Sequence, residues 1–390
     1  MFSSRLPQGL HANRVTLAVE AARASRATLL DLTETNPTVV DLPCADRWHG
    51  AFDGPMVGRY EPEPFGLPSA RQTIASHVGD EGRIQPEQIV LTASTSDAYS
   101  LLFKLLADSG DEVLMPRPSY PLFDLLTRLD NVRSVSYRLD GDAGWCLDRA
   151  SLERALSVRT RAILIVSPNN PTGSMLRAAD RDWLVGLAAT HSLAIIADEV
   201  FAPYPLAAPR NAVSLSGEDR ALVFTLGGLS KSAGMPQMKL AWTAVSGPRA
   251  ILGEALSRLE LIADTYLSVS TPVQLALPRL LDAGHVRRSA IAARLRENLE
   301  TLRSVISGAS SLTLLEPEGG WSAVVRVPAV QTEEELVVRL IERESVLVHP
   351  GYFFDFDDEA YLVVSLLPRP DVFAEAVKRV ARACHAGAPA

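Results

Sequence analysis

Cysteine is scarce in this chain of 390 residues, and long apolar runs are missing. The three cysteines, Cys44, Cys146 and Cys384, lie far apart and lack metal-ligand spacing, which argues against a disulfide framework or a structural metal site. No segment approaches the roughly 18 apolar residues of a membrane span, and the first residues lack the apolar stretch of a signal peptide. The simplest expectation is a cytoplasmic protein.

Basic patches are missing too. The net charge is -8 at pH 7 and no block of Lys or Arg occurs, which argues against nucleic acid or a membrane surface as a partner. Lysine is rare, with four residues, and two of these, Lys231 and Lys239, share one short segment. Because arginine is the usual cation of this chain, a lysine at either position suggests amine chemistry or a place where arginine does not fit.

Short apolar runs alternate with helical patterns from about residue 85 to residue 260, which is typical of βα units around a mostly parallel sheet. Seven strands are expected, at residues 89–91, 112–115, 132–138, 162–166, 194–197, 221–225 and 241–245. Helices are expected between them, at residues 98–106, 122–129, 147–156, 181–191 and 248–261. The fold class is therefore α/β.

The pattern changes after Thr271 to a long amphipathic stretch and then to a mixture of strands and helices, which predicts a smaller α+β domain. The strands are expected at residues 322–327 and 361–366, and the helices at 286–306, 332–343 and 371–383. We expect a large domain at residues 45–275 and a small C-terminal domain at residues 276–390. The N-terminal segment, residues 1–44, joins them and could pack onto either.

Polar residues follow several of the predicted strands, where ligands of open α/β sheets bind. Ser94 and Thr95 follow the first strand at the start of a helix, a position that suits a phosphate but is also usual for an ordinary N-cap. The turn from Ser167 to Gly173 has two prolines and presents two asparagines. Asp198 ends a buried strand, where a carboxylate needs a cation such as a protonated pyridine nitrogen.

A lysine stands in the loop after the strand at residues 221–225. The loop, Leu226 to Pro236, is rich in small residues and carries Lys231. Burial there would lower the pKa of the amine toward neutrality, which favours imine formation. Each of these features has an ordinary structural explanation, but their order along the chain and their common place at strand ends indicate a cofactor site.

On the motif Ser167-Pro168-Asn169-Asn170-Pro171-Thr172-Gly173 and the pair Ser230-Lys231, the chain resembles the class I/II aminotransferases of pyridoxal 5'-phosphate (PLP) fold type I, over nearly its whole length. The resemblance implies a seven-stranded mostly parallel sheet flanked by helices, with a smaller α+β domain. It also implies that Lys231 holds PLP as an internal aldimine and moves the reacting proton, and that Asp198 pairs with the pyridine nitrogen. The remaining cofactor contacts that it implies are Asn170 at the ring oxygen, Tyr120 over the ring, and Ser94, Thr95, Ser230 and Lys239 near the phosphate.

Three further matches concern the subunit partner and the substrate. Tyr60 matches a tyrosine that reaches the phosphate from the neighbouring subunit, which implies a homodimer with shared active sites. Asn36 matches a segment that lines the substrate pocket. His349, followed by Pro350 and Gly351, matches a turn near the site, and we expect a structural role for it.

The chain departs from the family pattern around the cofactor. Phe201 stands where most relatives have a tyrosine that donates to the ring oxygen, so this donor is lost unless Tyr204 replaces it. Lys239 replaces an arginine at the phosphate, which keeps the charge but loses the bidentate geometry.

A further departure concerns the substrate. Val363 stands at the position of the arginine that binds the substrate carboxylate, and a valine offers neither charge nor hydrogen bond. The groups that could replace it are Arg14, Arg369 and the amides of Asn36 and Asn170.

The function predicted from the sequence is a PLP-dependent aminotransferase that moves an amino group from an amino acid to a 2-oxo acid. Two alternatives stay open at this point. One is a PLP-dependent C–S or β-lyase of the same fold, and the other is a PLP-binding protein with little turnover. The partners expected are small-molecule substrates and a second copy of the chain, with no metal, nucleic acid or membrane.

Overall fold

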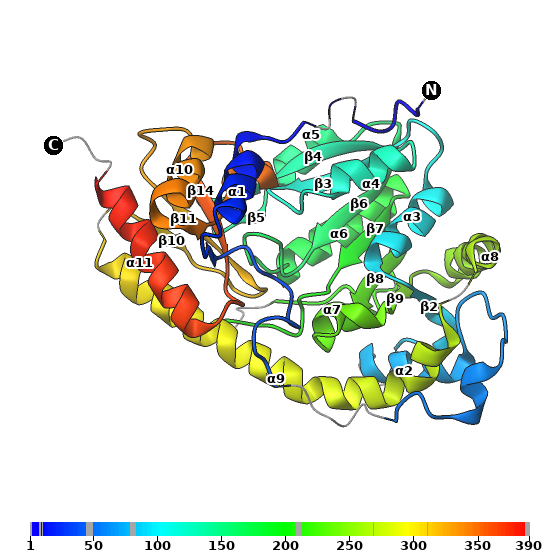
Figure 1. The fold of residues 1–390 in the computed structure, drawn as a ribbon. Coiled ribbons are helices and arrows are strands. Elements are labelled where there is room, and N and C mark those ends of the chain that lie inside the picture. The colour runs from blue at the N-terminus through cyan, green and yellow to red at the C-terminus, as the bar shows by residue number, and fades with distance from the viewer. Residues whose placement is uncertain are drawn as a thin grey trace.

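The computed structural model describes residues 2–7, 9, 11–43, 50–78, 83–207, 212–267, 269–309 and 311–386. These residues form a large sheet with helices on both sides and a smaller sheet beside it, and the long helix α9 (Thr271–Ser307) runs along both (Figure 1). The boundary predicted between residues 44 and 45 lies outside the described residues. The one predicted between residues 275 and 276 falls inside α9, so the division into domains stays a prediction.

The large sheet has eight strands in the order β2-β9-β8-β7-β6-β3-β4-β5. Their bounds are Ile89–Thr92, Ala241–Ser246, Val223–Gly228, Ala194–Asp198, Thr160–Val166, Glu112–Arg117, Arg133–Asp140 and Cys146–Leu147, in that order. Strands β8, β7, β6, β3 and β4 are parallel, whereas β9 is antiparallel to both neighbours and β5 to β4. All seven predicted strands are present. The eighth, β5, has two residues, too few to show a period-two pattern.

Both faces of this sheet are buried, which explains the uninterrupted apolar runs of its strands. In β6, Ala162, Leu164 and Val166 belong to the core on one face, and Ile163 and Ile165 to the core on the other. The first core includes α3 (Thr95–Leu106), α4 (Phe123–Leu129) and α8 (Arg249–Tyr266); the second includes α5 (Arg149–Ala155) and α6 (Ala178–His191). The carboxyl ends of the parallel strands therefore open at one edge between two helix layers.

The smaller sheet is antiparallel, in the order β10-β11-β14-β13. Its strands are Thr313–Leu315, Ser322–Arg326, Tyr361–Ser365 and His349–Pro350, and α10 (Glu333–Arg339) and α11 (Pro370–Ala386) belong to the same part. The N-terminal segment packs here: α1 (Arg14–Ala24) contacts α10, and β1 (Leu30–Asp31) pairs in parallel with β12 (Val346–Leu347) (Figure 1). Helix α1 and strand β1 therefore pack on the smaller part, whereas Arg5 donates to the Leu129 carbonyl oxygen at the end of α4.

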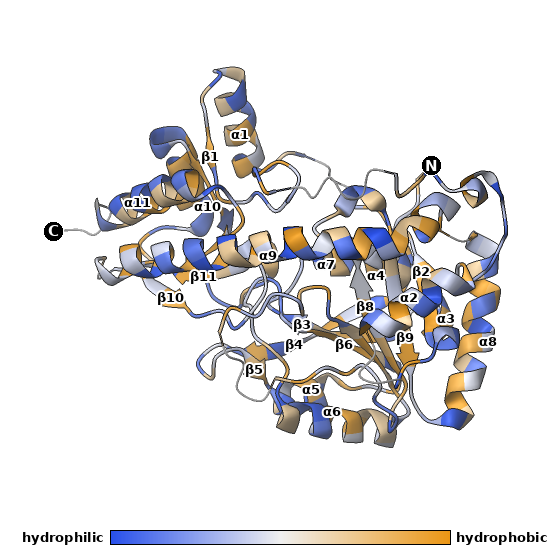
Figure 2. Cartoon of the chain, turned by 90° about the horizontal axis from the view of Figure 1, so that it is seen from below, coloured by the Kyte–Doolittle hydropathy of each residue, from blue (hydrophilic) through white to orange (hydrophobic). Residues whose placement is uncertain are grey.

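Helix α9 has 37 residues and a length of about 55 Å. Leu277 and Leu280 are buried in the core beneath β2 and β9, while Leu295 and Leu299 are buried in the core of the smaller part, so one helix fixes the two parts together. Hydrophobic and hydrophilic residues alternate along its visible face (Figure 2). No helix in the described ranges, α9 included, is apolar enough over sufficient length to cross a membrane.

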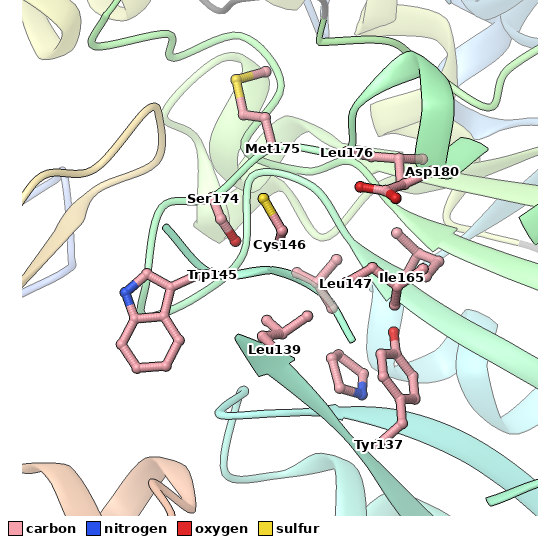
Figure 3. A pocket seen from close by; sticks show the side chains of 12 residues that line it. Tyr137, Leu139, Trp145, Cys146, Leu147, Ile165, Ser174, Met175, Leu176 and Asp180 are labelled. Carbon is pink, nitrogen blue, oxygen red and sulfur yellow. The ribbon is translucent and has the colours of Figure 1, made fainter. Parts of the chain in front are cut away.

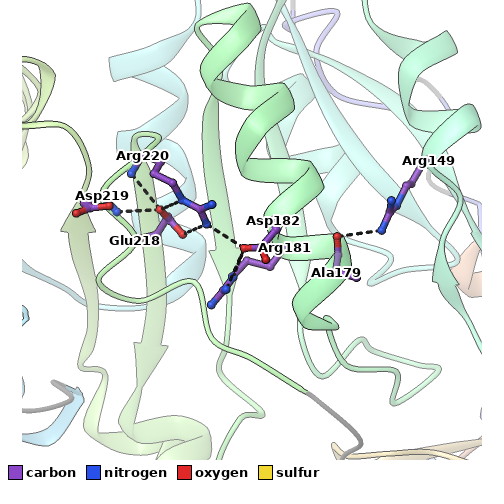
Figure 4. Close-up of polar contacts among 7 residues, drawn as sticks. All are labelled: Arg149, Ala179, Arg181, Asp182, Glu218, Asp219 and Arg220. Atoms are coloured by element: carbon purple, nitrogen blue, oxygen red, sulfur yellow. Dashed lines mark hydrogen bonds and ion pairs between the residues drawn. The ribbon is translucent and has the colours of Figure 1, made fainter.

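A surface network of ion pairs holds the turn before β8 against the start of α6 (Figure 4). Arg220 bonds Glu218 at 2.7 Å and Asp182 at 3.0 Å, and Arg181 bonds the same Asp182 carboxylate. The Arg220 and Asp182 side chains are 50% and 53% exposed, so the ion pair between them orients the turn and contributes little to the stability of the fold.

Candidate active site

A cavity of about 460 Å³ lies between the carboxyl ends of the large-sheet strands and the smaller sheet. Val166 and Asp198, the last residues of β6 and β7, line one wall, and Ser322, Val363 and Ser365 of β11 and β14 line the other. This volume lies within the range of small-molecule sites, roughly 300 to 1,000 Å³.

Lys231 enters the cavity from α7 (Leu229–Ser232), the short helix that directly follows β8. Its Nζ atom lies 4.4 Å from the ring centroid of Trp321 and 5.2 Å from that of Phe201. Burial lowers the pKa of Lys231 to about 8, although the negative charge of Asp198 opposes this shift. The lysine is thus held between two rings as an amine that loses its proton near physiological pH.

Asp198 is 7% exposed, and both of its carboxylate oxygens accept hydrogen bonds. The Tyr99 hydroxyl donates to Oδ2 at 2.7 Å and the Val200 amide donates to Oδ1 at 3.1 Å. Burial raises the pKa of Asp198, while these two donors and the charge of Lys231 hold it down. Within the described ranges no basic side chain forms an ion pair with Asp198, so the carboxylate suits a cationic group on a ligand.

Glu199 follows Asp198 but serves the structure of the loop. Its carboxylate accepts from the Ser214 hydroxyl at 2.6 Å and from the Leu215 amide at 2.8 Å. Successive residues of an extended chain point to opposite faces, which separates the tasks of the two acids.

The two asparagines of the proline-rich turn also have different surroundings. Asn170 lines the cavity. Asn169 is 2% exposed and holds the turn together, because its Oδ1 accepts from the Thr172 amide at 3.3 Å and from the Thr172 hydroxyl at 3.0 Å. Of the pair, Asn170 is the one placed to contact a ligand.

The start of α3 presents an anion site to the cavity. Ser94 is the N-cap, since its Oγ accepts from the Asp97 amide at 3.1 Å, and it does not line the cavity. Thr95 and Ser96 do line it, and their amides, the first two of the helix, have no hydrogen-bond partner in the described part of the chain. Free amides at a helix N-terminus favour a phosphate or carboxylate.

Two tyrosines considered from the sequence have different places. Tyr120 lines the cavity, with its ring in edge contact with Phe123 at a centroid distance of 5.6 Å. Tyr204 is fully buried, and its hydroxyl donates to the Lys231 carbonyl oxygen at 2.5 Å. Tyr204 therefore fixes the backbone of the lysine and does not supply the donor that Phe201 lacks.

The structure brings neither of the two arginines considered as substitutes to the cavity. Arg369 is held outside by Asp41 at 3.1 Å and Asp371 at 3.0 Å, and its side chain is 51% exposed. Arg14 pairs with Glu334 at 3.4 Å on the outer side of the smaller part. Both guanidinium groups satisfy carboxylates of this chain.

Four other predicted residues lie away from the cavity wall. Asn36 is exposed, and its Oδ1 accepts from the Thr38 amide and hydroxyl within a local turn. Ser230 is half-buried on α7, and Lys239 is exposed in a left-handed conformation with φ of 51°. Tyr60 is 69% exposed, as a residue that serves a neighbouring subunit would be.

Sequence reasoning missed several residues of the site. Tyr99 does not line the cavity, but its hydroxyl donates to Asp198. Tyr99 follows Thr95 by four residues, so helical spacing puts both on one face of α3, and this signal could have found it. Trp321 and Ser322 were also missed, and His349 was placed near the site but expected to have a structural role. All three come from the smaller part, where strand pairing decides which side chains face the cavity. No short motif carries that information.

A second cavity, near the β4–β5 edge, is much smaller (Figure 3). It measures about 30 Å³ and is lined by residues that include Cys146, Tyr137 and Asp180. This is room for about one or two water molecules, so the cavity does not compete as a cofactor site.

Comparison with known proteins defines the class of protein. Residues 31–380 match the family described as aminotransferase class I and II, and the chain belongs to this family. An alanine aminotransferase of Mycobacterium tuberculosis H37Rv is 27% identical over 325 residues, covering 81% of this chain and 76% of that protein. Nicotianamine aminotransferase B of Hordeum vulgare is 31% identical over 305 residues, covering 74% of this chain and 55% of that protein.

The solved structures agree with this assignment. Alanine aminotransferase from Pyrococcus furiosus superposes with a TM-score of 0.88 at 22% identity, covering 98% of this chain and 99% of that one. An aminotransferase from Escherichia coli superposes with a TM-score of 0.87 at 24% identity, covering 98% of this chain and 97% of that one. The predicted family, fold and reaction are confirmed: the chain is an aminotransferase of class I/II.

Proposed function

We propose that this aminotransferase binds PLP in the cavity and that Lys231 is the residue to which the cofactor becomes covalently attached. The observation that carries the proposal is that Lys231 and Asp198 line one cavity at the ends of the neighbouring strands β8 and β7. An amine with a pKa of about 8 suits reaction with an aldehyde. A buried carboxylate without a cation suits the protonated ring nitrogen.

The remaining contacts follow from the cavity wall. Thr95, Ser96 and their free amides would hold the phosphate, with Ser94, Ser230 and Lys239 as further groups near it. Asn170 would donate to the ring hydroxyl and Tyr120 would cover the ring. When bound, PLP supplies an aldehyde carbon that accepts the amino group and a ring that withdraws electrons from the substrate.

The protein supplies the proton transfers and the charges. With PLP bound, the neutral amine of Lys231 would take a proton from the α-carbon of the substrate and deliver it to the aldehyde carbon of the cofactor, because the amine lies inside the cavity and loses its proton near pH 8. The Tyr99 hydroxyl, by donating to Asp198, favours the charged form of this carboxyl against the effect of burial. The aromatic side chains of Trp321 and Phe201 exclude water around the amine.

For the substrates and the assembly we infer an amino acid donor, a 2-oxo acid acceptor and a homodimer that works in the cytoplasm. By their names, an alanine aminotransferase of Mycobacterium tuberculosis and a glutamate-pyruvate aminotransferase of Escherichia coli act on alanine or on glutamate and pyruvate, and both are similar to this chain, which supports small amino and oxo acids. Tyr60 is exposed, and so are Leu261 and Tyr266 on and near the end of α8, at 71% and 58%, which supports a partner surface.

A single-turnover experiment tests this function. The PLP-loaded protein is mixed with one amino acid and no acceptor, and the cofactor is analysed by chromatography. Formation of pyridoxamine phosphate supports the transferase. Release of ammonia and an oxo acid without pyridoxamine phosphate would indicate a lyase, and no change with any donor would indicate a binding protein. Lys231→Ala should abolish the reaction, and Lys378→Ala, at an exposed lysine of α11, is the matched control.

A further inference from the structure

Every amino acid or oxo acid brings a carboxylate into the cavity, and the wall offers it few partners. Among the described residues of the wall, Lys231 is the only one with the side chain of a strong base, and its amine serves the reaction. Val363, at the position of the expected arginine, is 2% exposed and belongs to an apolar cluster with Val324 and Phe354. The charge needed for the carboxylate must come from another group.

His349 is the neighbour of Val363 across the smaller sheet. Strand β13 pairs antiparallel with β14, and His349 is directly opposite Val363. Directly opposed residues of antiparallel strands project from the same face, with Cβ atoms about 4.5–5.5 Å apart. Both residues line the cavity. The imidazole therefore projects from the strand next to the one that carries position 363, on the same face of the sheet.

The imidazole is not committed to a structural task. Its ring lies against Phe353 and Phe354, each at a centroid distance of 5.8 Å. His349 is half-buried, and neither of its ring nitrogens has a hydrogen-bond partner among the described residues. Burial lowers the pKa of the imidazole. Because the ring lies in the cavity wall, its two nitrogens are available to a ligand in the cavity.

A hydroxyl stands on the same face. Ser322 is directly opposite Ser365 in the β11–β14 pair, and Ser365 is two residues from Val363, so all three side chains project into the cavity. The Ser365 hydroxyl donates to the Glu34 carbonyl at 2.7 Å. The Ser322 hydroxyl has no partner among the described residues and is free to donate.

We propose that His349, as the imidazolium, binds the carboxylate of the amino acid and oxo acid substrates in place of the arginine absent at position 363, with Ser322 as a second donor. The inference rests on the proposed function, because it assigns the substrate contact of the same cavity. It replaces the expectation of a purely structural role for His349.

Such a contact makes substrate binding depend on pH. A bound carboxylate stabilises the imidazolium and raises its pKa above that of the free enzyme. The contribution of His349 to carboxylate binding is therefore complete at pH values below its pKa in the free enzyme. It is lost as the pH rises through its higher pKa in the complex. The other ionisable groups around His349 are Asp31 on β1, Glu333 on α10, and Tyr361 on β14, with Lys231 and Asp198 across the cavity. A pH dependence that disappears when His349 is replaced belongs to His349 and not to these other groups.

The test measures carboxylate binding with and without chemistry. Propionate, which has no amino group to react, is used as a competitive inhibitor of the PLP-loaded enzyme, with propionamide as its neutral counterpart. In His349→Gln, the inhibition constant for propionate and the KM for an amino acid donor should rise by roughly tenfold to a hundredfold. The kcat should change much less, the pH dependence of propionate binding should flatten, and propionamide should be unaffected.

Two further variants keep the test decisive. His77→Gln alters a histidine that contacts Trp242 outside this cavity and should leave all values unchanged. Val363→Arg placed in the His349→Gln background should restore propionate binding and remove its pH dependence. Wild-type propionate binding and pH profile in His349→Gln would overturn the inference. If no amino acid yields pyridoxamine phosphate but propionate binding still requires His349, the proposed function fails and the carboxylate contact stands.

Discussion

Among the described residues, Tyr99 is the one side-chain donor to Asp198, so Tyr99→Phe tests how the fold favours the charged form of this carboxyl. The Tyr99 hydroxyl is 2.7 Å from Asp198 Oδ2, and both residues are buried. A hydrogen bond to a charged group contributes about 1.5–3 kcal/mol. The free energy of unfolding of the cofactor-free protein should fall by about this amount at a pH where Asp198 is ionised.

The sign of the pH dependence follows from the pKa shift. Burial raises the pKa of Asp198 and the tyrosine opposes the rise, so the variant should have a still higher pKa. A raised carboxyl pKa contributes stability that is present below the unfolded-state value and is lost as the pH rises through the folded-state value. The destabilisation caused by Tyr99→Phe should therefore grow with pH and shrink in acid, where a protonated carboxyl no longer needs the donor.

Urea unfolding of the cofactor-free protein, from about pH 5 to pH 8, measures this difference. Tyr137→Phe is the matched control, because Tyr137 is equally buried but donates to the neutral Leu164 carbonyl at 2.7 Å. The loss of unfolding free energy caused by Tyr137→Phe should be independent of pH. If the loss caused by Tyr99→Phe is also independent of pH, the electrostatic role assigned to Tyr99 is refuted.

Three other outcomes are expected. The rate at which the cofactor-free protein takes up PLP should rise with pH and level off above about 8, because only the neutral Lys231 amine attacks an aldehyde; a rate flat with pH by stopped-flow absorbance would contradict this. Asp198→Ala should lower kcat more than about tenfold, a barrier change above ~1.4 kcal/mol, with unchanged circular dichroism. Mixed dimers of Tyr60→Phe and Lys231→Ala protomers should regain activity over either parent, and hybrids without any gain would exclude a shared site.

The large-sheet side of the cavity could be predicted from the sequence, and the reason is local. Parallel strands buried on both faces give continuous apolar runs, so the polar residue that ends a run, as in Asp198, marks the edge where ligands bind. Lys231 could be found in the same way, because it is a rare lysine that closely follows the apolar run of β8. Tyr99 required only the further step of placing it one helical turn beyond Thr95.

The opposite wall could not be predicted in the same way, because it depends on strand register. Val363 and His349 are 14 positions apart, and only the pairing of β13 with β14 makes them neighbours on one face. A shift of one residue in that pairing would turn the imidazole away from the cavity. Arg369 was attractive by sequence distance, but Asp41 and Asp371 hold it outside, a contact that spans distant parts of the chain.

The two walls therefore constrain different properties of the enzyme. The large-sheet wall, with Lys231, Asp198 and the start of α3, would contact the proposed cofactor, which is the same for every substrate. The smaller sheet, with His349, Val363 and Ser322, would contact the groups that the substrate brings. Substitutions on the first wall should lower kcat and cofactor affinity together, whereas substitutions on the second should change KM among substrates. Because the departure at Val363 and the proposed contact of His349 both belong to the second wall, they bear on substrate choice.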